Sequence, residues 1–293
     1  MTHDVAGPSV ASDGSMPLTF GSLFAGIGGF DLGLESAGMR CLWQVERDDY
    51  ATRVLAKHWP AVERWRDVET FPPVGGDWSV DVICAGPPCQ PISSAGHRKG
   101  CHDERWMWGE CLRIVATLKP SVFVAENPTN LLNDDRGRTF RAIVGALSSV
   151  GYDAEWHVIP ACAVGAPHRR NRVWIVAYTD EQRRWGGEPS KALQGMGEAG
   201  QELAGSGEPR RGGRHSVAAT TRLGDRIRRE LEAPSGVQGM LGAARVYWAT
   251  EPGVGRVADG FPSRVDRLRC LGNAAVPQVV RAIGRAIVTG ARA

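Results

Sequence analysis

A cysteine set between prolines is the most reactive group that this 293-residue chain presents in a recognisable context. Cys89 lies in the segment Gly86–Pro91, directly after the apolar run Val80–Ala85. Proline stiffens the backbone, and α/β sheets bind ligands at the carboxyl ends of their strands, so a thiol here is suitably placed to act as a nucleophile. A buried cysteine in a tight turn would give the same pattern, and Cys89 alone leaves both interpretations open.

Two further motifs carry charged groups at the ends of apolar runs. Glu126 opens a Glu-Asn-Pro tripeptide after Val122–Ala125, and a carboxylate that leaves a hydrophobic strand toward a pocket is expected to have the raised pKa of a general acid. Arg170 and Arg172 lie in the segment His168–Arg172 and alternate, so both would project from one face of a strand. A solvated basic turn is the commoner fate of such a run.

A glycine-rich turn, Phe24–Phe30, follows the strand candidate Leu18–Leu23. Glycines at a strand-to-helix turn permit close approach of the backbone to a ligand. About twenty residues later Glu46 ends the next strand candidate, the usual position of a carboxylate that binds ribose hydroxyls. Turn and carboxylate together indicate a nucleoside site, not necessarily a dinucleotide site; a purely structural turn is the alternative.

Strand candidates that alternate with helical segments must position these motifs. The amphipathic stretches Asp48–His58 and Met107–Leu118 are examples of the helical segments. The alternation predicts a doubly wound α/β sheet whose right-handed crossovers bring the loops after its strands to one edge. The strand candidates are Leu18–Leu23, Cys41–Val45, Val80–Ala85, Val122–Glu126, Glu155–Pro160 and Val173–Ala177.

The composition changes along the chain and predicts a discontinuous core domain. Residues 1–16 are small and polar, as in a disordered tail. From 180 the chain is rich in glycine and arginine, and the apolar helical pattern resumes over Val265–Val288. We expect a core of 17–179 plus 258–293, interrupted by an inserted region 180–257 in which part of 186–213 is disordered.

The overall composition excludes several classes of protein. With 42% hydrophobic and 23% charged residues the chain is globular, and no apolar run approaches the roughly 20 residues that span a bilayer. The N-terminal residues lack the pattern of a secretory signal, so a cytoplasmic protein without a membrane partner is expected. A net charge of +3 permits nucleic-acid binding without indicating it. Seven cysteines without a CxxC pair favour neither a disulfide framework nor a metal site.

Together with the segment Gly272–Pro277, these motifs resemble, in their order and spacing, the cytosine-5 DNA methyltransferase family. The resemblance extends from Leu18 to Val288 and puts 180–257 in the place of the family's target-recognition region. It implies a Rossmann-like S-adenosylmethionine-dependent methyltransferase sheet with a small inserted recognition domain. It also implies methyl transfer from S-adenosylmethionine, which becomes S-adenosylhomocysteine, to carbon 5 of a flipped-out cytosine in a specific double-stranded DNA sequence.

The resemblance assigns roles to individual residues. Cys89 would add to carbon 6 of cytosine, Glu126 would bind nitrogen 3 and the exocyclic amine, and Arg172, with Arg170, would supply positive charge at the ring. The implied DNA contacts are Gln90, Ser93 and Arg105. The implied cofactor contacts are Phe24, Gly26, Ile27, Gly28, Glu46, Asp67, Pro88, Met107, Asn273 and Ala274.

Four residues depart from the family's common pattern, and two other functions remain open. Ser22 stands where many members have an acidic residue, and His168, Pro128 and Ala274 replace a common glutamine, valine and serine. An RNA (tRNA) cytosine-5 methyltransferase and a catalytically inactive DNA-binding module are the alternatives to the DNA enzyme. A monomer is expected; the target sequence and the presence of a cognate restriction endonuclease stay open.

Overall fold

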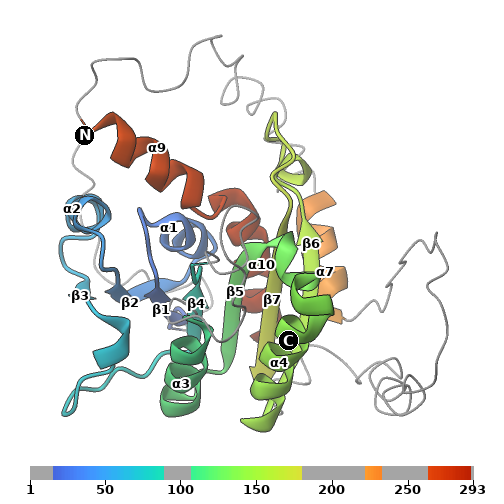
Figure 1. Cartoon of the computed structure of the whole chain (residues 1–293), viewed down its shortest axis with the longest axis horizontal. Coiled ribbons are helices and arrows are strands. Elements are labelled where there is room, and N and C mark those ends of the chain that lie inside the picture. Colours follow the sequence, from blue (N-terminus) through green and yellow to red (C-terminus); the bar gives the residue numbers. More distant parts are fainter. Residues whose placement is uncertain (1–15, 89–106, 180–221, 233–262, 292–293) are drawn as a thin grey trace, which may run out of the picture.

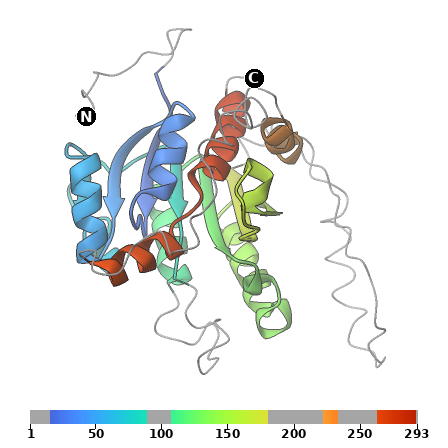
Figure 2. The same cartoon turned by 90° about the horizontal axis from the view of Figure 1, so that it is seen from above.

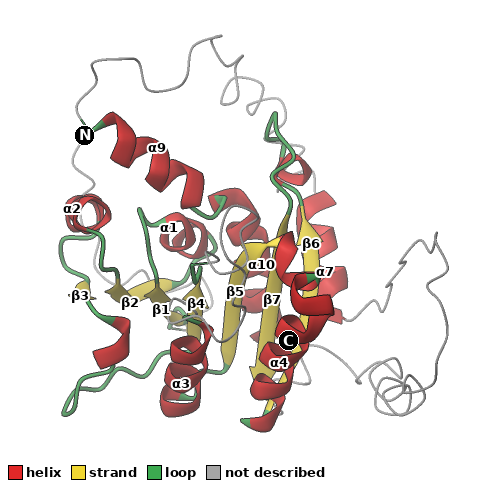
Figure 3. Ribbon diagram, viewed as in Figure 1, coloured by secondary structure: helices red, strands yellow, loops and turns green. Residues whose placement is uncertain are grey.

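The computed structural model describes residues 16–88, 107–179, 222–232 and 263–291, which build a helix–sheet–helix sandwich (Figures 1 and 3). The predicted contacts Cys89, Gln90, Ser93 and Arg105 lie outside these residues. In the described part, one seven-stranded sheet has the order β3-β2-β1-β4-β5-β7-β6. Strand β7 pairs antiparallel with both of its neighbours, whereas β1 to β5 run parallel to one another.

The predicted strands are confirmed within a few residues at each end. One further strand, β3, was not predicted because it is three residues long and carries no buried side chain. The strands are β1 (Thr19–Leu23), β2 (Arg40–Val45), β3 (Glu63–Trp65), β4 (Val82–Ala85), β5 (Val122–Pro128), β6 (Tyr152–Ile159) and β7 (Arg172–Thr179).

Helices cover both faces of the sheet, as Figure 2 shows from above. On one face, α3 (Trp108–Leu118) and α4 (Arg138–Ser149) bury Trp108 and Phe140 against the strands. The other face carries α1 (Gly29–Ser36), α10 (Pro277–Ala291) and α7 (Arg222–Glu232). Helix α2 (Asp49–His58) lies beside α1, and α9 (Arg264–Asn273) lies above both in the view of Figure 1. In the described ranges no helix is long and apolar enough to cross a membrane.

Helix α7 belongs to the core although the predicted insertion, 180–257, includes it. Leu223 and Ile227 are buried in the same cluster as the side chains of α10, and Glu230 forms an ion pair with Arg285 at 3.6 Å. An apolar i, i+4 pair on one face of a helix is the pattern that anchors it to a core. The structure therefore differs from the predicted division over residues 222–232, which pack on the sheet domain.

The C-terminal segment returns to the first motif through a close contact between α1 and α10. At Gly33, an added Cβ would lie 2.4 Å from Cβ of Val280 and 2.7 Å from the carbonyl oxygen of Pro277. Such distances are far below van der Waals contact, so only glycine lets the two helices approach this closely. This packing fixes the C-terminal helix against the first helix of the chain.

Replacing Gly33 by alanine should therefore destabilise the fold. We expect the free energy of unfolding to fall by about 1–3 kcal/mol, the usual cost of overpacking. Gly145→Ala is the matched control, because Gly145 lies within α4 and an added Cβ would meet nothing within 4 Å. Alanine is the better helix former, so this control should be neutral or stabilising. Urea unfolding of both variants decides: equal stability of the two would contradict the close α1–α10 contact.

Candidate functional site

A cavity of about 350 Å³ opens at the edge of the sheet where β1, β2, β4 and β5 end. Its walls come from the loops after these strands, from the start of β7 and from the segment around Gly272. Ten of the predicted site residues line it: Phe24, Gly26, Glu46, Asp67, Pro88, Met107, Glu126, Arg172, Asn273 and Ala274. The structure thus brings the predicted cofactor and cytosine residues into one space.

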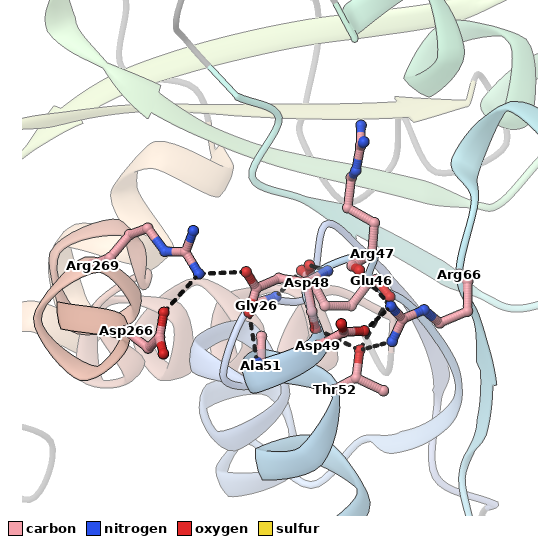
Figure 4. A network of polar contacts seen from close by, with 10 residues as sticks. All are labelled: Gly26, Glu46, Arg47, Asp48, Asp49, Ala51, Thr52, Arg66, Asp266 and Arg269. Carbon is pink, nitrogen blue, oxygen red and sulfur yellow. Dashed lines mark hydrogen bonds and ion pairs between the residues drawn. The ribbon is translucent and has the colours of Figure 1, made fainter. Parts of the chain in front are cut away.

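Glu46 is held rigidly beside the glycine turn (Figure 4). Its Oε2 accepts a hydrogen bond from the backbone N–H of Gly26 at 2.7 Å, and its Oε1 accepts one from the N–H of Asp48 at 2.7 Å. Each carboxylate oxygen has two lone pairs, so both can accept one more hydrogen bond. A carboxylate fixed in this way is suited to receive the two hydroxyls of a ribose.

Two of the predicted cofactor residues, Ile27 and Gly28, are not among the residues that line the cavity. Gly28 has a φ of 86° and forms the N-cap of α1, and an added Cβ would lie 2.4 Å from the ring of Trp59. Gly28 therefore shapes the turn and packs against Trp59, which leaves contact with a ligand to Gly26 and Phe24.

A buried carboxylate, Asp31, joins the helix that follows the glycine turn to the two neighbouring strands. Asp31 of α1 accepts hydrogen bonds from Ser22 Oγ at 3.1 Å and Gln44 Nε2 at 2.7 Å. Burial raises the pKa of Asp31, and its hydrogen bonds oppose that rise. Ser22, one of the departures from the family pattern, thus donates to an acidic side chain that comes from α1.

Glu126, which is buried, forms an ion pair with the half-buried Arg172 at the other end of the cavity. The pairing of β5 with β7 sets Pro128 opposite Arg172, so the two charged residues are diagonal neighbours on one face of the sheet. Arg172 Nε lies 2.8 Å from Glu126 Oε1. Burial raises the pKa of Glu126, as the sequence predicts, while the charges of Arg172 and Arg170 lower it. Burial is the larger of these opposing influences, so the pKa of Glu126 stays above its ordinary value.

Asn127 connects this strand to the loop that leads to Cys89. Its Nδ2 donates to the carbonyl oxygen of Pro87 at 3.0 Å, and its side chain is buried. Pro88, which lines the cavity, is the last described residue before Cys89. The strand that carries Glu126 therefore fixes the position at which the proline-cysteine loop starts.

Arg170 has a different position from the one predicted for it. It is not a lining residue of the cavity; its Nη2 donates to the carbonyl oxygens of Gly272 at 2.7 Å and Ala274 at 2.9 Å. Its backbone φ of 35° is unusual for a residue with a side chain. Arg170 therefore ties the loop before β7 to the C-terminal segment and acts on Glu126 through its charge.

The sequence interpretation missed several polar residues of the cavity wall. Asp48 is the N-cap of α2 and Arg269 lies on α9, and the two form an ion pair across 221 positions of sequence. A local signal existed for Asp48 alone, because an aspartate before an amphipathic stretch is a helix-start signal. The other missed residues are Arg47, Arg66, Glu69 and Cys270.

The raised pKa of Glu126 predicts a pH dependence of stability. The folded protein holds this proton to a higher pH than the unfolded chain, in which the carboxyl has its ordinary pKa of 4.5. The stabilisation is complete below that value and is lost as the pH rises through the folded pKa. Glu126→Gln cannot ionise, so its free energy of unfolding should fall less than that of the wild type as pH rises. Urea titrations from about pH 4 to pH 8 measure this, and parallel curves for the two proteins would contradict it.

Comparisons with known proteins agree with this arrangement. A family model described as "C-5 cytosine-specific DNA methylase" matches residues 18–200. The chain is 38% identical over 165 residues to Type II methyltransferase M.BsuFI of Bacillus subtilis, which covers 55% of this chain and 39% of the relative. It is 32% identical over 165 residues to Type II methyltransferase M.HhaI of Haemophilus parahaemolyticus. That match covers 56% of this chain and 50% of the relative. The chain thus spans half the length or less of these two relatives.

Two solved structures share the fold over nearly the whole chain. One is a putative DNA modification methyltransferase encoded within an E. coli prophage, with a TM-score of 0.59, 17% identity, and coverage of 94% of this chain and 100% of that one. The other is the Entamoeba histolytica methyltransferase EhMeth, with a TM-score of 0.55, 13% identity, and coverage of 94% and 99%. At these identities the similarity shows the Rossmann-like fold alone.

Proposed function

Since the chain belongs to the C-5 cytosine-specific DNA methylase family, we propose that it transfers a methyl group from S-adenosylmethionine to carbon 5 of cytosine. The substrate is a flipped-out base in a specific double-stranded DNA sequence. The observation that carries the proposal is the ion pair of the buried Glu126 with Arg172, which shares one cavity with the fixed carboxylate of Glu46. The end of the cavity at Glu46 thus offers groups that can bind a nucleoside. The end at Glu126 and Arg172 offers a proton donor and a cation for a cytosine ring.

The residues of the first end fit S-adenosylmethionine. The cavity volume lies within the roughly 300–1,000 Å³ of small-molecule sites. Phe24, Val68 and Pro88 supply apolar surface, and Glu46 and Asp67 supply acceptors for the ribose hydroxyls and the adenine amine. Gly26 faces open space, because a Cβ added there would meet nothing within 4 Å. When bound, the cofactor supplies an electrophilic methyl group.

The residues of the second end can activate cytosine. Carbon 5 is a poor nucleophile until a thiolate adds to carbon 6, and Cys89 is the proposed source of that thiolate. Glu126, protonated, donates to nitrogen 3 as electron density moves into the ring, and its other oxygen accepts from the exocyclic amine. Arg172 donates to the ring carbonyl oxygen, and its charge favours the thiolate form of a nearby cysteine. After carbon 5 has gained the methyl group, nitrogen 3 returns its proton to Glu126. A base then removes the proton of carbon 5, the double bond between carbons 5 and 6 re-forms and the thiolate leaves.

This chemistry requires that the base leave the duplex. Flipping costs a few kcal/mol, which contacts to the extruded base and to the DNA backbone must offset. Gln90, Ser93 and Arg105 are proposed as DNA contacts, and the parts of 180–257 outside α7 are proposed to read the target sequence in the groove. We further propose that the protein acts as a monomer in the cytoplasm, because each reaction concerns a single cytosine.

A covalent-trapping experiment tests the proposal. Duplex DNA that contains 5-fluorocytosine in place of cytosine should capture the protein in the presence of S-adenosylmethionine, because fluorine at carbon 5 prevents the final elimination. The complex should survive denaturing electrophoresis, and Cys89→Ser should abolish it. Glu126→Gln should reduce the rate of capture by at least about 100-fold, the lower range for loss of general acid–base catalysis.

The outcomes distinguish the alternatives. Trapping that persists in Cys89→Ser would show that the nucleophile is another residue. Transfer of a labelled methyl group to tRNA but not to any duplex would favour the RNA enzyme. Binding to duplex DNA without transfer on any sequence would favour an inactive DNA-binding module.

A further inference from the structure

Helix α9 borders the cavity although it is poorly anchored in the core. Of its ten residues only Cys270 is buried. Val265, Leu268 and Leu271 are 76%, 42% and 50% exposed. Hydrophobic packing, which fixes most helices in proteins, therefore does little to hold α9 beside the cavity.

Polar contacts hold the helix instead, and they form a continuous chain to the glycine turn (Figure 4). Arg269 Nη2 lies 2.5 Å from Asp48 Oδ2 and 3.3 Å from Asp266 Oδ1. The backbone N–H of Asp48 donates to Glu46, whose other oxygen accepts from Gly26. The contact that positions α9 is thus two hydrogen bonds away from the turn that faces the nucleoside.

Asp48 has two roles that use different oxygens. Its Oδ1 accepts the backbone N–H of Ala51 at 2.9 Å and so caps α2, while its Oδ2 pairs with Arg269. Asparagine can take over the first role but not the second, because it caps helices about as well as aspartate and carries no charge. The two roles can therefore be separated by one substitution.

The C-terminal end of α9 is attached more firmly than its middle. Arg170 donates to the carbonyl oxygens of Gly272 and Ala274, and the next residue, Ala275, is buried against α1, where a Cβ added at Gly29 would lie 2.5 Å from its carbonyl oxygen. The ion pair of Arg269 lies one turn before this anchored end. Breaking it would free α9 while leaving the anchor intact.

We propose that the Asp48–Arg269 ion pair is a clasp that holds α9 against the cofactor cavity and governs how long the cofactor stays bound. Both are positioning residues: they act through the placement of α9, whose Arg269, Cys270, Gly272 and Asn273 line the cavity. The ligand is S-adenosylmethionine or its product, so this inference rests on the proposed function. The pair is partly exposed, since 53% of the Arg269 side chain and 29% of the Asp48 side chain are accessible. Salt therefore screens it, and it opens readily for ligand exchange.

Three variants and a matched control test the clasp. Asp48→Asn and Arg269→Gln break the ion pair, and Arg269→Lys keeps the charge. The control is Asp49→Asn, which removes the same charge from the neighbouring residue; Asp49 pairs with Arg66 and not with α9. Arg66 remains bound to Arg47 and Thr52 in this control.

The first readout is S-adenosylhomocysteine binding, by calorimetry for Kd and by stopped flow for the dissociation rate. In low salt, Asp48→Asn and Arg269→Gln should speed dissociation by about two- to five-fold, as expected for the loss of one exposed ion pair. Their double variant should be no faster than either. Asp49→Asn should match the wild type, and Arg269→Lys should lie between the wild type and the broken-clasp variants, because lysine keeps the charge but not the guanidinium geometry. High salt should bring the wild type toward the broken-clasp variants.

The second readout needs no ligand. Cys270 is the buried residue of α9, a free cysteine that lines the cavity. Its alkylation by iodoacetamide, followed peptide by peptide with mass spectrometry, should be faster in Asp48→Asn and Arg269→Gln than in Asp49→Asn. If both broken-clasp variants equal the control in dissociation and alkylation, the clasp does not exist. If the wild type fails to bind S-adenosylhomocysteine, the proposed cofactor is wrong, and the alkylation rates alone then decide on the clasp.

Discussion

A buried carboxyl group beside a guanidinium is the constraint on which the site depends. Glu126 is buried at the end of β5, where desolvation favours its protonated form, and Arg172 at 2.8 Å favours the ionised form. Burial is the larger effect, so the pKa of Glu126 is raised and its carboxyl group is suited to donate a proton. This arrangement requires that β7 enter the sheet in the antiparallel direction. Only then does the start of β7, with Arg172, lie at the edge where β5 ends.

Further contacts join the proposed cofactor end of the cavity to the proposed base end. Asn127 ties the end of β5 to Pro87, and Arg170 ties the loop before β7 to the carbonyls of Gly272 and Ala274. These links join the base end of the cavity to the segment that also faces Glu46. The glycine contact between α1 and α10 then fixes that segment on the sheet domain. The end of β5, the loop before β7 and the segment around Gly272 are far apart in sequence. Short polar contacts and one close helix contact fix their relative positions.

Much of this could be predicted from the sequence, because apolar runs mark buried strands and motifs mark their ends. Glu46, Glu126 and Arg172 lie in the cavity, as their positions after or before such runs predict. The direction of β7 could not be predicted, because an apolar strand reads the same way in either orientation. The core position of α7 was missed because its two buried residues, Leu223 and Ile227, stand among many charged ones. The pair of Asp48 with Arg269 joins positions with no local pattern in common.

The central claim is that the chain methylates carbon 5 of cytosine in a particular duplex sequence. Bisulfite sequencing of DNA from a host that expresses the protein measures this directly, because 5-methylcytosine resists conversion. One cytosine within one short sequence should be protected throughout the DNA, and the protection should disappear when the host expresses Cys89→Ser at the same level. DNA that is fully converted in every sequence context, in a host that accumulates the folded wild-type protein, would contradict the account.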